Sequence, residues 1–144
     1  MKPMKALKNK LLAASIAALL LGSATLVAAA DAEPVIHSNA NVSYVSGGVG
    51  SESLDRLGAI AGQFNVKLIF AMNSGEYVSN VRVEITDSKG RNVVDARSDG
   101  PWFLARLPVG HYQLVATLSG QAEKRQLDVG ANKLSTVDFR WAAR

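Results

Sequence analysis

The chain has 144 residues, no cysteine, and 16 Lys and Arg against 12 Asp and Glu, a formal net charge of +4. The absence of cysteine excludes disulfide bridges, thiolate metal sites and cysteine nucleophiles. Four lysines and no acids precede residue 31, so a chain that begins at Asp31 is neutral. Its charges are interspersed by sign, which argues against nucleic-acid binding.

Residues 1–30 have the layout of a secretory signal peptide. A lysine-rich start precedes the apolar run Leu11–Leu21, and small residues then lead to cleavage sites after residue 30 or 32. A retained membrane anchor is the alternative, because apolar character continues to Ala30. Gly, Ser and Thr residues interrupt the run and favour cleavage. The sequence therefore predicts an exported bacterial protein, periplasmic or secreted, with no membrane span after cleavage.

Residues 31–50 contain few large apolar side chains and many Asn, Ser and Gly residues. This composition predicts a flexible N-terminal arm followed by a Gly-rich segment. Val42 and Tyr44 alternate within it, as in a short edge strand that ends in a glycine loop. The glycines at 47, 48 and 50 would let a partner's backbone approach closely and exchange main-chain hydrogen bonds. The alternative is a connector between the arm and the next element.

Residues 51–64 are the one helical candidate. Leu54, Leu57 and Ile60, with Ala61 and Phe64, recur at steps of three and four and so share one face. Two internal glycines weaken the helix by about 1 kcal/mol each relative to alanine. The helix therefore depends on packing, and we expect it to lie over a sheet edge or a barrel end.

After residue 64 the apolar period changes to two, which is typical of half-buried strands. Turn residues separate strands that we expect near 66–70, 81–86, 92–97, 102–107, 112–118, 123–129 and 136–141. About seven short strands indicate a mainly β protein, an antiparallel Greek-key β-sandwich with one short N-terminal helix.

The stretch 81–118 resembles the carboxypeptidase regulatory-like domain, a β-sandwich related in shape to transthyretin. The positions that carry the resemblance are Val83, Ile85, Asp87, Gly90, Asp99, Gly100, Trp102 or Phe103, Leu107, Gly110, Tyr112 and Leu114. The resemblance implies such a sandwich over residues 65–144, in a small exported bacterial protein, and it implies no activity. Residues 44–64 lie outside the family pattern.

Trp102 and Phe103 are adjacent on an expected strand, so their rings face opposite sides. One ring therefore lies outside the core, in a loop that Pro101 stiffens. An exposed ring there would suit a binding surface. The alternative is that this ring lies beneath the helix at 51–64.

No catalytic, metal or cofactor site is expected from the sequence. His37 and His111 have no neighbouring ligands at useful spacings. The converging histidines of the transthyretin-like hydrolases are missing, and so is a Gly-x-Ser-x-Gly nucleophile elbow.

The sequence thus predicts a non-enzymatic module that binds another protein or an envelope component. The expected partner-binding residues are Tyr44, Ser46, Gly47, Gly48, Gly50, Trp102 and Phe103. The alternative is a carbohydrate or cell-wall-binding module, which requires exposed rings at Trp102, Tyr77 or Trp141. Edge-to-edge pairing of two copies is a further expected contact, because an open sheet leaves unpaired edges.

Overall fold

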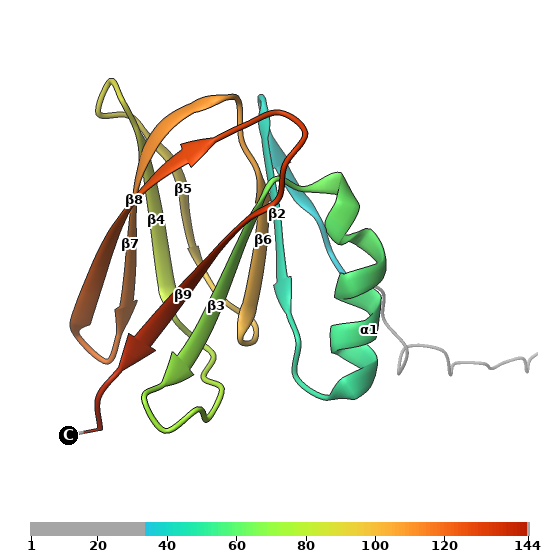
Figure 1. Cartoon of the computed structure of the whole chain (residues 1–144), viewed down its shortest axis with the longest axis vertical. Helices are drawn as coiled ribbons and strands as arrows, with labels where there is room; N and C mark the ends of the chain where they lie inside the picture. Colours follow the sequence, from blue (N-terminus) through green and yellow to red (C-terminus); the bar gives the residue numbers. More distant parts are fainter. Residues whose placement is uncertain (1–33, 144) are drawn as a thin grey trace, which may run out of the picture. The chain divides into compact units, whose positions relative to one another are not determined.

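The computed structural model describes residues 34–143, so the expected signal peptide lies outside the described residues. The described chain is mainly β, with one short helix (Figure 1). Its elements are β1 (His37–Asn39), β2 (Val42–Gly47), α1 (Ser51–Ile60), a 3-10 turn (Ala61–Gln63), β3 (Val66–Met72), β4 (Arg82–Asp87), β5 (Asn92–Arg97), β6 (Trp102–Arg106), β7 (Gly110–Leu118), β8 (Gln121–Val129) and β9 (Ser135–Trp141).

The strands form two sheets, with the orders β1-β2-β6-β3-β9 and β5-β4-β7-β8. Nine strands are present between residues 34 and 143, rather than the seven expected. The pairing is also not purely antiparallel, because β9 runs parallel to β3, with Val66 opposite Ser135. The seven expected strands are all present as β3 to β9, so the two additional ones precede the helix.

The two additional strands lie within residues 34–50, where we expected a flexible arm and then a short edge strand that ends in a glycine loop. β1 and β2 form a hairpin, and β2 also pairs with β6 from Ser43 to Gly47. β2 is therefore an inner strand and not an edge. It is held there because Val45, on the face toward α1, is fully buried, and because Val42 on the other face reaches the main core.

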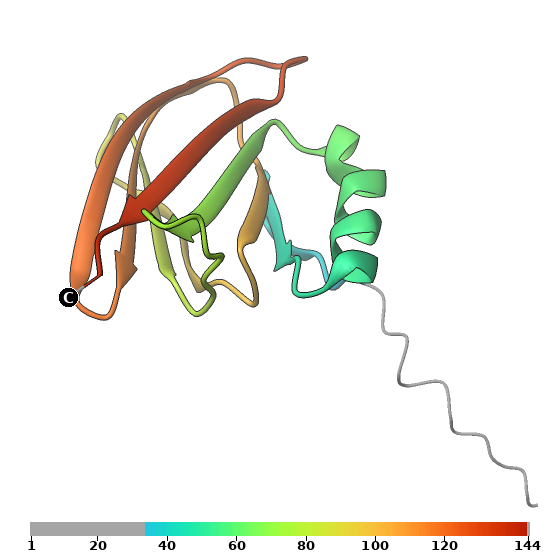
Figure 2. The same cartoon turned by 60° about the horizontal axis from the view of Figure 1, so that its bottom comes forward.

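The two sheets face each other (Figure 2). They enclose a common apolar core, to which the inward face of nearly every long strand contributes. Alternation explains this core, since every second side chain of a strand points to the same face. Its fully buried larger members include Phe70, Phe103, Phe139, Leu68, Ile85 and Leu114.

Helix α1 lies on the opposite face of the five-stranded sheet, beside β2 and β6 (Figure 2). Leu57 and Phe64 pack there against Val45 and Leu104 in a second, smaller apolar cluster. The predicted helix is thus confirmed from Ser51, although it ends at Ile60 and continues as a 3-10 turn.

Candidate functional site

The glycine segment expected to meet a partner is occupied by contacts within the protein. The backbone N–H of Gly48 donates to Ser53 Oγ, at 2.8 Å. Gly48 is buried at a φ of +100°, and a Cβ there would lie 3.0 Å from Leu54 and 3.4 Å from Pro101. The segment therefore serves as a tight connection between β2 and α1. Gly50 is exposed, with φ +88°, and has open space around it.

Ser46 and Tyr44 are likewise engaged internally. Ser46 Oγ donates to the Trp102 carbonyl and accepts from the Asp99 N–H, which fastens the β5–β6 turn to β2. The Tyr44 ring is half-buried and stacks on Phe103, at 5.2 Å between ring centres. His37 stacks on Tyr44, at 5.0 Å.

Trp102 and Phe103 face opposite sides, as predicted, but neither offers an exposed ring. Phe103 is fully buried in the core between the sheets. Trp102 is half-buried in the cluster beneath α1, and the ammonium of Lys67 lies 3.6 Å from its ring centre. The alternative that placed the outer ring under the helix is therefore the one observed.

Of the three rings proposed for carbohydrate binding, Trp102, Tyr77 or Trp141, one is exposed, one is half-buried and one is buried. Trp141 is 2% exposed and donates from Nε1 to the Gln121 carbonyl, which closes the side between β8 and β9. Trp102 lies under α1, as described above. Tyr77 is 55% exposed. It is therefore the one ring of the three that is open to solvent.

Five connections of the described chain meet at one end of the two sheets (Figure 1). The strand registers require this, because β2, β3, β5, β7 and β9 begin at that end and β4, β6 and β8 finish there. We call this surface the turn end. It comprises residues 40–41, 64–65, 88–91, 107–109 and 130–134 with the strand ends beside them.

Three adjoining hollows cross the turn end. The first, of about 450 Å³, lies between the turns that precede β2, β5 and β7. It shares Asn41, Pro108 and Val109 with a second hollow of about 270 Å³. The second shares Arg106 and Ala131 with a third of about 460 Å³, beside the end of α1. Together they make one uneven surface across the end of both sheets.

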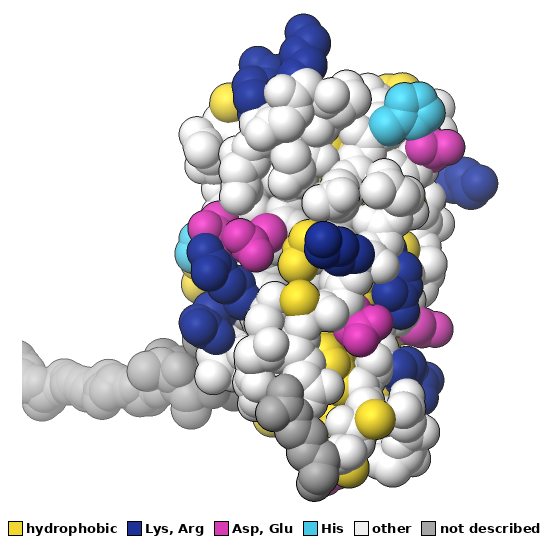
Figure 3. All heavy atoms as spheres, turned by 90° about the vertical axis from the view of Figure 1, so that its left-hand side faces the viewer, with side chains coloured by type: hydrophobic (Ala, Val, Ile, Leu, Met, Phe, Trp, Pro, Cys, Tyr) yellow, Lys and Arg dark blue, Asp and Glu magenta, His cyan; other side chains and the backbone are white. Residues whose placement is uncertain are grey.

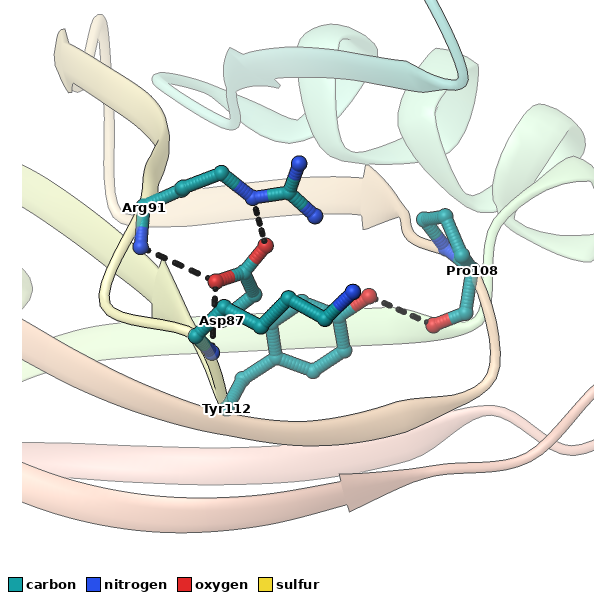
Figure 4. A network of polar contacts seen from close by, with 5 residues as sticks. Asp87, Arg91, Pro108 and Tyr112 are labelled. Carbon is teal, nitrogen blue, oxygen red and sulfur yellow. Dashed lines mark hydrogen bonds and ion pairs between the residues drawn. The ribbon is translucent and has the colours of Figure 1, made fainter.

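A polar network stands in the wall of the first hollow (Figure 4). The carboxylate of Asp87 accepts from the backbone N–H groups of Lys89 and Arg91 and from Arg91 Nε, at 2.9 to 3.0 Å. The pKa of Asp87 is lowered, above all by the Arg91 backbone N–H. The network shapes the β4–β5 turn, and Asp87 is consequently committed to structure.

Tyr112 also has a structural role there. Its hydroxyl donates to the Pro108 carbonyl, four residues earlier, at 2.7 Å (Figure 4). Burial raises the pKa of Tyr112, and the charge of Asp87 adds to this effect. A tyrosine that bonds back to the preceding turn is a known brace at the corners of two-sheet β proteins. The hydroxyl proton is therefore held by a backbone carbonyl, whereas a general acid or base must face a reacting group.

Positive charge predominates at the turn end. Among the described residues that line the three hollows, four carry a positive charge and one a negative charge: Lys89, Arg91, Arg106 and Lys133, and Asp87. His111 also lines the first hollow and contacts Asp128 at the surface. On the β4, β5, β7 and β8 side, charges of both signs are interspersed, while Lys and Arg stand out at the upper end (Figure 3).

Sequence reasoning did not identify this surface, and one of its key residues is Asn65. Asn65 is 3% exposed, and its Nδ2 donates to the carbonyls of Leu107 and, at 3.4 Å, Gly130. Its Oδ1 accepts from the Leu107 N–H. One side chain thus ties the β6–β7 and β8–β9 turns together. In the sequence, Asn65 is a single polar residue between a helix and a strand. That position does not reveal which turns its side chain binds.

The sequence matches no family model and no curated protein. Within residues 34–143 no helix has the length and hydropathy to cross a lipid bilayer. In the same range, no three His, Asp or Glu side chains converge as a metal site would need. What the turn end offers chemically is hydrogen bonding, positive charge and two apolar tips, Val109 and Leu134.

Proposed function

We propose that this chain is an exported, non-enzymatic module, a β-sandwich of the carboxypeptidase regulatory-like type, that binds a protein or an envelope component. The shared core of the two sheets and the strand–turn succession of residues 81–118 support the fold assignment. The parallel pairing of β3 with β9 gives the sandwich a mixed sheet. Export is supported by the signal-peptide pattern of residues 1–30.

The observation that carries the binding function is the surface at the turn end. Val109 is 67% exposed and Leu134 39% exposed, on two turns that flank the hollows. Neither side chain belongs to either apolar cluster, and so stability does not require them. Apolar side chains surrounded by polar and charged groups are the arrangement of an interaction surface with an apolar centre and a polar rim. We therefore place binding there rather than at the glycine segment or at Trp102.

The polar groups near the first hollow favour binding over chemistry. Asp87 and Tyr112 are engaged in contacts that hold the turns. A catalytic pair would need an acid or base aimed at a free position. A binding surface needs only groups that can reach outward, and the exposed Lys89 and Lys133 side chains meet that need.

The experiment is a capture of envelope components on immobilised residues 34–144, which form a compact unit of their own and contain both apolar clusters. A second bait carries Val109→Asp at the turn end. A third, the matched control, carries Ser119→Asp in the β7–β8 turn at the opposite end, where φ is +49° and Asp is tolerated.

We expect a component that the unchanged bait and the Ser119→Asp bait retain, and that the Val109→Asp bait loses. Equal retention by all three baits would show that the binding site lies away from Val109. Retention of nothing by the unchanged bait would overturn the binding function itself.

A further inference from the structure

We propose that the turn end docks on a lipid surface whose headgroups carry phosphate anions, with the Val109 and Leu134 side chains entering the headgroup layer. The inference rests on the proposed binding function and names the class of partner. The contact is made by residues 34–144, which rest on the surface of the bilayer without crossing it.

The first support is the uneven distribution of charge. Residues 34–143 carry eleven Lys and Arg and ten Asp and Glu, a net charge of +1. The hollows of the turn end hold four of the cations and one of the acids, a local charge of +3. The remainder of the described chain is therefore net negative, at −2, since +1 minus +3 leaves that value. Such an asymmetry orients the protein with this end toward an anionic surface.

The second support is that these cations are largely uncommitted. Within residues 34–143 the ammonium groups of Lys89 and Lys133 have neither an ion pair nor a hydrogen bond. Arg106 makes one long hydrogen bond, to the Gln63 carbonyl at 3.4 Å. Only Arg91 is paired, with Asp87. Two cations on different turns and one at the end of β6 can therefore reach phosphate oxygens without breaking an internal ion pair.

The third support distinguishes a lipid surface from a soluble polyanion. Val109 and Leu134 are exposed at the tips of the β6–β7 and β8–β9 turns, between the cations. A polyphosphate or acidic glycan would gain nothing from apolar tips. A headgroup layer accepts such side chains at its acyl boundary while phosphates bind the surrounding cations. The two sheets behind the turns hold both tips on a rigid base.

The test is co-sedimentation of residues 34–144 with vesicles. One set contains phosphatidylcholine alone, and the other contains phosphatidylcholine with about one third phosphatidylglycerol. Circular dichroism and thermal unfolding establish that each variant is folded before it is used. We expect binding to the anionic vesicles that is at least tenfold tighter than to the neutral ones, and that weakens in 0.5 M salt because screening shortens the reach of charge.

The cation variant is Lys89→Gln with Arg106→Gln and Lys133→Gln. Each cation near an anionic surface contributes about a fivefold factor, so the triple variant should bind on the order of a hundredfold more weakly. The matched control is Arg97→Gln with Lys124→Gln and Arg140→Gln, three exposed cations outside the turn end. It lowers the net charge equally and should change binding by no more than about threefold.

The apolar variant is Val109→Ser with Leu134→Ser, which leaves the charge unchanged and should weaken vesicle binding about tenfold. Equal binding to both vesicle types, or an equal loss in the control triple, overturns the inference. So does binding that soluble polyphosphate abolishes and that the apolar variant leaves intact, since a polyanion is then the ligand. If vesicles fail while the capture experiment still yields a component lost with Val109→Asp, the proposed function stands and only the lipid inference falls.

Discussion

Gly100 lies directly against the backbone of Gly47, so that a Cβ at position 100 would be 2.3 Å from the Gly47 carbonyl oxygen. The contact joins the β5–β6 turn to the end of β2, next to the point where the chain enters α1. Two glycines far apart in the sequence therefore make possible a single close approach, which sets the β5–β6 turn directly against the last residue of β2.

Gly100→Ala should lower the free energy of unfolding by about 3 kcal/mol, because the backbone on both sides must shift to admit the methyl group. Urea unfolding of residues 34–144 measures this. The control is Gly58→Ala in α1, where a Cβ meets nothing within 4 Å. It should raise stability by about 1 kcal/mol through helix propensity. A Gly100→Ala protein as stable as the parent would show that the approach is not tight in solution.

Asn65→Ala should cost about 3 kcal/mol, because the buried N–H and carbonyl of Leu107 lose their partner. Asn65→Asp keeps the volume but replaces the Nδ2 donor with an acceptor facing two carbonyls, so it should be at least as unstable at neutral pH. Asn132→Ala, exposed in the β8–β9 turn, serves as the control and should change stability by less than about 0.5 kcal/mol. Similar thermal midpoints for all three variants would contradict the role of Asn65 in tying the β6–β7 and β8–β9 turns together.

Asp87 should make the protein sensitive to acid. Its pKa is lower in the folded protein than the ordinary value of about 3.9, chiefly because the Arg91 backbone N–H donates to the carboxylate. A carboxyl of this kind stabilises the fold above its unfolded pKa and loses that effect as pH falls through its folded pKa. Asp87→Asn should therefore lose less stability than the parent between pH 6 and pH 3.

The measurement is the urea midpoint across that pH range. The comparison variant is Asp138→Asn, whose exposed carboxylate has no ion pair in the described part of the chain. It should follow the parent's pH dependence. Parallel curves for parent and Asp87→Asn would contradict the role given to the Arg91 N–H.

Trp102→Phe should keep stability within about 1 kcal/mol of the parent. The Trp102 Nε1 is buried without a hydrogen-bond partner within residues 34–143, and the substitution removes that penalty while shortening the ring. Trp102→Ala should cost about 3 kcal/mol, since it opens a cavity under α1. Vesicle binding by Trp102→Phe should be unchanged. A tenfold loss of vesicle binding in this folded variant would show that the Trp102 ring belongs to the interaction surface.

Ser119→Asn should stabilise the β7–β8 hairpin by about 0.5 kcal/mol. Ser119 and Gly120 both have positive φ, +49° and +84°, as in a two-residue type I′ turn. Asn adopts this conformation more readily than Ser. A rise in the thermal midpoint of residues 34–144 checks it, and Ser119→Val, which is β-branched, should lower the midpoint instead.

The strand alternation was readable from local sequence, β2 included, whereas β1 was not. β5 occupies residues 92–97 as predicted, and Val94 points inward as its period requires. β1 has the sequence His-Ser-Asn and no buried side chain, so no apolar period marks it. It forms because β2 offers it a partner edge, which is a property of the sheet and not of those three residues.

For the candidate site, too, some features followed from local sequence and others depended on the tertiary structure. That Trp102 and Phe103 face opposite sides follows from strand geometry, and the structure agrees. Which ring is covered, and by what, depended on where α1 packs. The glycines at 47 and 48 were predicted to meet a partner's backbone; within this chain Gly47 lies against the backbone of Gly100, and Gly48 lies against the side chains of Leu54 and Pro101.

By itself the sequence determined which residues face a core, because a strand or helix repeats over a few neighbouring residues and records that period locally. Only the tertiary structure decided that β9 runs parallel to β3, and that Lys89, Arg106 and Lys133 come to one end. Lys89 and Lys133 stand on connections and Arg106 ends β6, so the three are well separated along the chain. Their meeting is set by strand register, which long-range hydrogen bonds and the shared core establish together.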